Sequence, residues 1–173
     1  MSSVRSVFSL LLTTAFLLTG HGIHMTFLPL MASEIGLSQT VIGISGSAYF
    51  AGFISGALVT PHIIAKVGHI RGFTTLMAVF LCCFQILPMT DSGAIWILIR
   101  FLLGAVMCGA YTVVESWLSD QADSRTHGRV LAIYTVVVLS AMALGQGLLN
   151  LTYGEAAKVF ALISIMIGCA IIP

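Results

Sequence analysis

Residues 6–31 read SVFSLLLTTAFLLTGHGIHMTFLPLM, a run of 26 positions that contains no Asp, Glu, Lys or Arg. About 20 helical residues are enough to cross the hydrocarbon core of a bilayer. A secretory signal peptide is the alternative interpretation of this N-terminus, but its apolar core is only about 7–15 residues long. The run therefore predicts a first transmembrane helix.

The composition of the whole chain agrees with that first run. Of its 173 residues, 58% are apolar and only 8% are charged, whereas a soluble domain has roughly 25% charged residues. The net charge of +1 offers no basic patch to a phosphate backbone. These values exclude a soluble enzyme, a disordered chain and a nucleic-acid binder, and they indicate an integral protein of the lipid bilayer.

Six charge-poor runs predict six transmembrane helices in one bundle, residues 1–173. The runs are 6–31, 41–65, 72–88, 94–118, 130–152 and 158–173. None has the alternating polarity of a barrel strand, so we expect an all-α membrane protein. The four cysteines lie inside these runs without zinc-ligand spacing. We therefore expect reduced thiols, and neither a metal nor a cofactor.

The basic residues indicate the orientation of the chain. With a cytoplasmic N-terminus, five of them fall inside and only Lys158 falls outside. The five are Arg5, Lys66, Arg71, Arg125 and Arg129. This asymmetry follows the positive-inside rule, and it predicts a multi-pass protein with its N-terminus in the cytoplasm.

Small residues on the second run predict close helix packing. Five positions lie within about 80° of one another on a helix: Ser45, Tyr49, Gly52, Gly56 and Thr60. Small residues mark the places where membrane helices approach each other. A cavity lined by Tyr49 and Ser45 is the alternative interpretation of the same stripe.

The fourth run carries two charges on one face. Its stripe, again about 80° wide, contains Arg100, Gly104, Cys108, Tyr111 and Glu115. Arg100 and Glu115 lie about 22 Å apart along the helix axis, so they do not pair. Arg100 either takes part in solute or proton movement or pins the helix to its neighbours. Glu115, near the inner end, is interpreted as a gating or loop-anchoring residue.

Further polar residues lie within the predicted first and fifth helices. His21 and His24 share a face of the first helix and either exchange protons or remain neutral and hydrogen-bonded. No Asp, Glu or Cys accompanies them, so we expect no metal site. On the fifth helix, Gln146 and Asn150 either bind a polar solute or bridge helices, next to the small packing residue Gly145.

Two further functions stay open at this point. The string Gly43-Ile44-Ser45-Gly46 has the G-x-S-G pattern of an intramembrane serine hydrolase, with His21 or His24 as the base. Helix packing explains the same residues. A non-transporting membrane subunit is the other alternative.

Several motifs, in order, resemble those of the major facilitator superfamily. Arg100-Phe-Leu-Leu-Gly104 resembles the R-x-x-x-G motif of the fourth helix. The loop Lys66-Val-Gly68-His-Ile-Arg71 is similar to the basic loop after helix two, although Ala65 and Pro61 replace its acid and its first glycine. The stretch from Arg125 to Arg129 resembles the loop before helix five. Glu115-Ser-Trp117-Leu is similar to the bacterial branch called YcaD-like.

The resemblance implies a fold and a function. The fold is the N-terminal half of a twelve-helix transporter, built of two inverted three-helix repeats. The C-terminal half is absent from the 173 residues, so we expect either a fragment or pairing with a second copy. The function is secondary transport of a small solute by alternating access, coupled to protons, in the bacterial inner membrane.

The residues expected to act in transport fall into three groups. The solute and proton path comprises His21, His24, Tyr49, Arg100, Tyr111 and Gln146. The gating and loop residues are Lys66, Gly68, Arg71, Glu115, Arg125 and Arg129. The helix-packing residues are Gly52, Gly56, Gly104 and Gly145.

Overall fold

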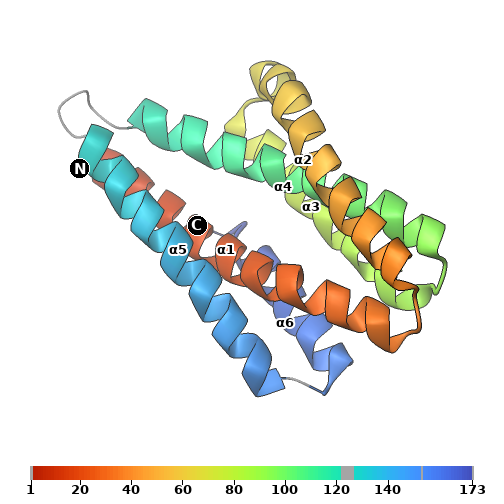
Figure 1. The fold of residues 1–173 in the computed structure, drawn as a ribbon. Coiled ribbons are helices and arrows are strands. Elements are labelled where there is room, and N and C mark those ends of the chain that lie inside the picture. The colour runs from red at the N-terminus through yellow and green to blue at the C-terminus, as the bar shows by residue number, and fades with distance from the viewer. Residues whose placement is uncertain (1, 122–126, 153, 173) are drawn as a thin grey trace. The chain divides into compact units, whose positions relative to one another are not determined.

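A computed structural model describes residues 2–121, 127–152 and 154–172 of the chain, and in this part it is entirely helical apart from short turns (Figure 1). This confirms the predicted all-α class. The elements are α1 (Ser2–Glu34), α2 (Gln39–Val67), α3 (His69–Ile86), the 3-10 turn η1 (Leu87–Met89), α4 (Gly93–Gln121), α5 (His127–Thr152) and α6 (Ala156–Cys169).

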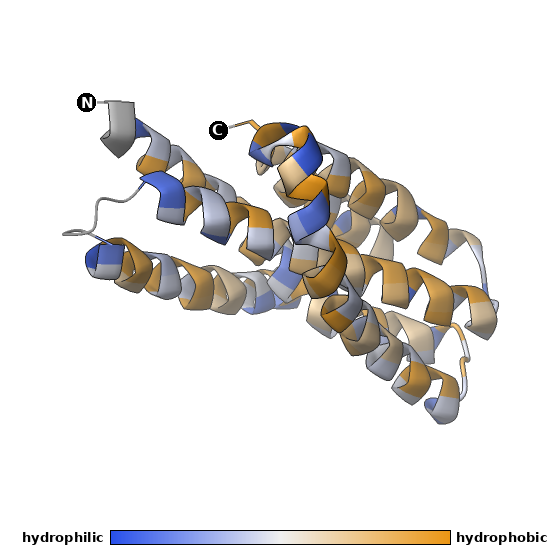
Figure 2. Ribbon diagram, turned by 90° about the horizontal axis from the view of Figure 1, so that it is seen from above, coloured by the Kyte–Doolittle hydropathy of each residue, from blue (hydrophilic) through white to orange (hydrophobic). Residues whose placement is uncertain are grey.

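The helices have the length and surface of a membrane protein. Five of them are long and apolar enough to cross a bilayer, whereas α6 has 14 residues. Figure 2 shows hydrophobic residues on each of these helices. Large apolar side chains remain exposed along α2, where Phe50, Ile54 and Leu58 have exposed fractions of 60%, 66% and 71%. Exposed apolar side chains cost little free energy in lipid, because the surrounding acyl chains are as apolar as the side chains themselves.

The connection between α2 and α3 is a single glycine. Ser38 caps the start of α2, where its Oγ accepts a hydrogen bond of 3.3 Å from the amide of Val41. Gly68 ends the helix with φ +80°, and its N–H donates to the carbonyl of Ile64. Glycine is favoured in such a conformation because a Cβ would clash. The abrupt turn places α3 directly after α2.

The chain divides into two compact units, and each is described by itself. Unit 1 comprises residues 1–27 and 114–173, and unit 2 comprises residues 28–113. The boundary falls within α1 and within α4, so each unit contains part of these two helices.

In unit 2, glycines allow the backbones of α2 and α4 to touch. A Cβ added at Gly52 would overlap the carbonyl oxygen of Phe101, and one at Gly56 would overlap that of Ala105. The approach is reciprocal, because a Cβ at Gly104 would overlap the carbonyl oxygen of Tyr49. Small residues on both helices therefore set the distance between them.

In unit 1, α1 makes equally close contacts with α5 and α6. A Cβ at Gly145 of α5 would overlap the carbonyl oxygen of Thr19, and one at Gly22 of α1 would meet the carbonyl of Met142. Toward α6, the rings of Phe27 and Phe160 meet edge to face with centroids 5.3 Å apart. Figure 1 shows α5 running alongside α1 in this unit.

We predict that Gly52→Ala destabilises the protein, because the new Cβ has no room beside the backbone of α4. Overpacking of this kind costs typically about 1–3 kcal/mol. Gly43→Ala is the matched control on the same helix, since a Cβ at Gly43 meets nothing within 4 Å. Thermal unfolding in detergent measures both variants. Equal midpoints for the two would contradict the close contact between α2 and α4.

Candidate functional site

The guanidinium of Arg100 lies buried in unit 2 against the ring of Tyr49. Arg100 is 3% exposed and Tyr49 is 2% exposed. The Cζ atom of Arg100 is 4.6 Å from the centroid of the tyrosine ring. This is the geometry of a cation–π interaction, which is worth up to about 2 kcal/mol when water is excluded.

The glycine contact between α2 and α4 positions this pair. Gly104 is one helical turn from Arg100, and the backbone of Tyr49 packs directly on it. Further aromatic rings line the same side of α2. The rings of Tyr49 and Phe53 have centroids 6.4 Å apart, and Phe53 lies 6.1 Å from Tyr111 on α4. Tyr111 itself is half-buried.

The cation–π contact does not fully compensate the buried charge. A buried arginine in a membrane helix is costly, and the cost rises toward about 2.5–3.5 kcal/mol at the helix centre on the most lenient scale. Among the described residues, Nη1 of Arg100 has no hydrogen-bond partner. A guanidinium with five N–H donors therefore retains donor capacity beside Tyr49. The N–H groups of Nη1 could therefore donate to a hydrogen-bond acceptor on a molecule that comes next to Arg100 and Tyr49.

Unit 1 contains a second buried polar pair, the stacked imidazoles of His21 and His24. Their ring centroids are 5.7 Å apart with an interplanar angle of 27°, and the side chains are 5% and 0% exposed. Two unit charges at this separation repel by about 3 kcal/mol at an effective dielectric constant near 20. Burial of a second positive charge on this pair is therefore unfavourable.

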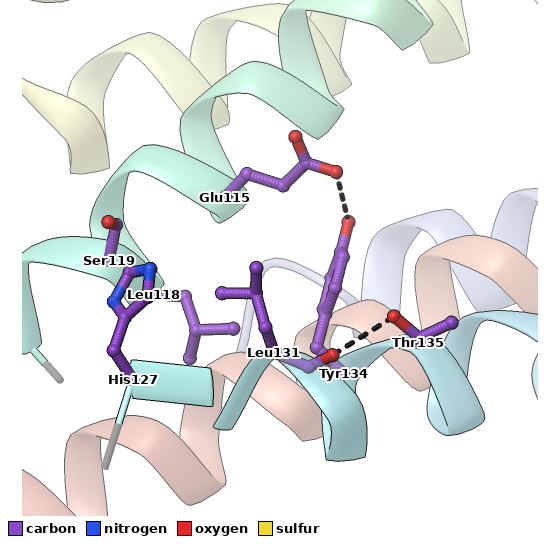
Figure 3. A pocket seen from close by; sticks show the side chains of 7 residues that line it. All are labelled: Glu115, Leu118, Ser119, His127, Leu131, Tyr134 and Thr135. Carbon is purple, nitrogen blue, oxygen red and sulfur yellow. Dashed lines mark hydrogen bonds between the residues drawn. The ribbon is translucent and has the colours of Figure 1, made fainter. Parts of the chain in front are cut away.

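A third polar group joins α4 to α5 in unit 1. The hydroxyl of Tyr134 donates a hydrogen bond of 3.0 Å to Oε1 of Glu115 (Figure 3). The two residues border a pocket of about 350 Å³. Its lining comprises Glu115, Leu118, Ser119, His127, Leu131, Tyr134 and Thr135.

Sequence reasoning did not identify Tyr134 or His127 as functional residues. The sequence does place them on one face of a helix, because the pocket residues of α5 at 127, 131, 134 and 135 recur at intervals of three or four positions. Those of α4 at 115, 118 and 119 share a face in the same way. Which face of α5 meets Glu115 depends on the packing of the two helices, and no spacing within one helix reveals it.

Other predicted site residues lie apart from these groups. Gln146 is exposed on α5, although its neighbour Gly145 is buried. Lys66, Gly68, Arg71 and Arg129 are all exposed. Gly68 alone lies between helices, whereas Lys66 is in the last turn of α2 and Arg71 and Arg129 are in the first turns of α3 and α5. Arg125 lies outside the described residues.

Ser45 is buried on α2, and its hydroxyl donates to the carbonyl of Ile42 at 2.8 Å. This bond lies within one helical turn, as expected of a serine packed in a membrane helix. Ser45 belongs to unit 2, whereas His21 and His24 belong to unit 1. Within the described part of the chain, no three His, Cys, Asp or Glu side chains gather as a metal site would require.

Comparison with known proteins adds a family relationship. Residues 10–172 match the family described as Major Facilitator Superfamily. The chain is 30% identical over 175 aligned residues to the "Uncharacterized MFS-type transporter YcaD" of Salmonella arizonae and to that of Salmonella newport, covering 100% of this chain and 46% of each relative. The Salmonella typhi protein of the same name is 29% identical over 98% of this chain and 44% of its own length.

The chain thus spans about half the length of the curated relatives it matches. No solved structure matches it significantly.

We predict that Arg100 and Tyr49 stabilise the protein jointly. In a double-mutant cycle of Tyr49→Leu and Arg100→Met, the coupling energy should be about 1–2 kcal/mol, the value of a desolvated cation–π pair. Tyr49→Phe keeps a ring and should retain most of the coupling. Thermal or chemical unfolding in detergent supplies the free energies. Additive single-mutant effects would show that the two side chains do not interact.

Proposed function

Because the chain belongs to the Major Facilitator Superfamily, we propose that it moves a small solute across the membrane by alternating access, coupled to protons. The family and the apolar helices make it an integral, multi-pass membrane protein, and the family supports a role in transport. Alternating access and coupling to protons are parts of this proposal.

The buried guanidinium of Arg100 carries the proposal. A charge in a membrane helix is costly and is usually turned toward a partner or a path for solutes. Here it is 3% exposed, rests on one aromatic ring and keeps an Nη1 that no described residue uses. Helix packing alone would be served better by an apolar side chain, which costs nothing to bury. The unused donor supports a role in binding the solute.

The histidine pair supports coupling to protons. Histidine is the side chain most often used to exchange protons near neutral pH, and two charged rings at this separation would repel each other. Gly20 and Gly22 flank His21 and allow α6 and α5 to approach it. A proton taken up here would alter the charge at the point where three helices meet within unit 1.

Alternating access requires elements at the membrane surface that couple the helices. We assign this role to the exposed residues at the turn between α2 and α3, which are Lys66, Gly68 and Arg71. Arg125 and Arg129, before and at the start of α5, and Glu115, near the inner end of α4, share it. The positive-inside rule supports a cytoplasmic location for the basic residues of this group, together with the N-terminus. The organisms of the relatives support the bacterial inner membrane as the location.

The described helices supply one half of a transport path in this proposal. Transporters of this kind bind their solute between two halves related by repeat symmetry. The relatives are about twice as long as this chain. A second six-helix half, or a second copy of the chain, would complete the path.

Arg100→Ala should abolish proton-coupled uptake, and Arg100→Lys should restore little of it, because an ammonium lacks the planar fork of a guanidinium. The assay reconstitutes the protein in liposomes that contain the pH indicator pyranine. It then applies, one at a time, amino acids, sugars, carboxylates and amines. Lys158→Ala is the control, since Lys158 is an exposed cation paired with Glu155. Wild-type rates in Arg100→Ala would remove Arg100 from the path.

The doubly substituted variant His21→Gln, His24→Gln should separate proton movement from solute movement. With the solute found in that panel, uptake driven by a pH gradient should fall at least about tenfold, which corresponds to about 1.4 kcal/mol. Exchange of labelled for unlabelled solute should continue, since it needs no net proton transfer. Unchanged pH-driven uptake would contradict the assignment, and so would loss of both activities.

A further inference from the structure

The pocket between α4 and α5 has the features of a ligand site that the proposed transport path does not use. Its volume of about 350 Å³ lies within the range of roughly 300–1,000 Å³ found for small-molecule sites. Such sites combine apolar walls with a few placed polar groups. Here Leu118 and Leu131 supply apolar surface, and Glu115, Tyr134 and Ser119 supply polar groups.

The charge of the pocket indicates whether its ligand is a cation or an anion. Glu115 is the one carboxylate among the lining residues, and an ionised carboxylate offers about four acceptor sites and no donor. The hydroxyl of Tyr134 uses one of them at Oε1. Figure 3 shows these two side chains pointing toward each other. The remaining acceptor sites of Glu115 favour a ligand that carries N–H donors.

The other lining residues favour an organic cation over a metal ion. One carboxylate is a poor site for a divalent metal ion, which takes about six or more oxygen ligands when it is calcium or magnesium. An alkyl chain on the cation would instead cover Leu118 and Leu131. The hydroxyl of Thr135 donates within its own helix to the carbonyl of Leu131 at 3.0 Å, so its oxygen is presented as an acceptor.

We infer that the pocket between α4 and α5 binds a small organic ammonium ion. Its N–H groups contact the carboxylate of Glu115, and its alkyl part contacts Leu118 and Leu131. All seven lining residues belong to unit 1, whereas Arg100 and Tyr49 belong to unit 2, and neither histidine of the proposed proton pair lines the pocket. Glu115 is shared with the gating role proposed above, so the test measures ligand binding and not transport, and its outcome does not depend on that of the uptake assays.

The test measures binding of n-butylammonium by isothermal titration calorimetry to the full chain in a non-ionic detergent and an amine-free phosphate buffer. The wild type should bind saturably, and sodium butyrate should not bind. Glu115→Gln should weaken binding at least about tenfold, or about 1.4 kcal/mol. Tyr134→Phe should weaken it several-fold. Glu155→Gln is the matched control, because Glu155 is exposed and pairs with Lys158; it should bind as the wild type does.

A second variant, Leu131→Phe, tests the same site if Glu115→Gln does not fold. It reduces the pocket volume without changing its charge, at an exposed position, and it should weaken n-butylammonium binding as well. Equal binding to the wild type, Glu115→Gln and Leu131→Phe would overturn the inference. Absence of saturable binding to the wild type, or equal binding of butyrate, would also overturn it.

A phospholipid with an ammonium headgroup offers the same chemistry as a soluble amine. The titration is therefore repeated in nanodiscs of phosphatidylglycerol alone and of phosphatidylglycerol mixed with phosphatidylethanolamine. Loss of n-butylammonium binding in the mixed nanodiscs identifies the lipid headgroup as the occupant. Equal binding in both identifies a soluble amine.

Discussion

A guanidinium held between apolar helices requires compensation for the water it has lost, and the arrangement of unit 2 follows from that requirement. Gly52, Gly56 and Gly104 bring the backbones of α2 and α4 into contact. This contact places the ring of Tyr49 over Arg100, with 4.6 Å between Cζ and the ring centroid. Larger residues at the glycine positions would separate the helices, and the charge would then lose its partner. The small residues therefore meet that requirement, because they allow Tyr49 to contact Arg100.

Unit 1 repeats this relation between small and polar residues. Gly22 and Gly145 bring α1 against α5, and the stacked pair of His21 and His24 lies on the same stretch of α1. In both units a polar pair is buried where glycine removes the space between helices. The bond between Tyr134 and Glu115 differs, because it lies beside an open pocket and Glu115 is exposed. That difference is why we assign a ligand to the pocket, beside the gating role of Glu115, and the solute and proton path to the buried pairs.

Much of the fold was predictable because lipid simplifies the sequence signal. A charge-free run such as residues 6–31 has few alternatives to a membrane helix, and the ordered motifs around Arg100 identified the family that the comparisons confirm. The pairing of side chains was harder to predict. Tyr49 and Arg100 were both expected on the path, yet their contact depends on the register of α2 against α4. Tyr134 was missed for the same reason, because a tyrosine on an apolar helix carries no mark of its partner. The orientation of the chain and the roles of the loop residues stay predictions.

Accessibility of a single cysteine at position 53 tests alternating access at Arg100 most directly. The ring of Phe53 lies between those of Tyr49 and Tyr111, and Phe50, exposed on α2, provides the control position. The four native cysteines are first replaced by serine, and a charged, membrane-impermeant methanethiosulfonate reagent is applied to right-side-out and to inside-out vesicles. We expect Phe53→Cys to be labelled from both sides and Phe50→Cys from neither. Labelling of Phe53→Cys from one side only, or from neither, would contradict a solute path beside Arg100.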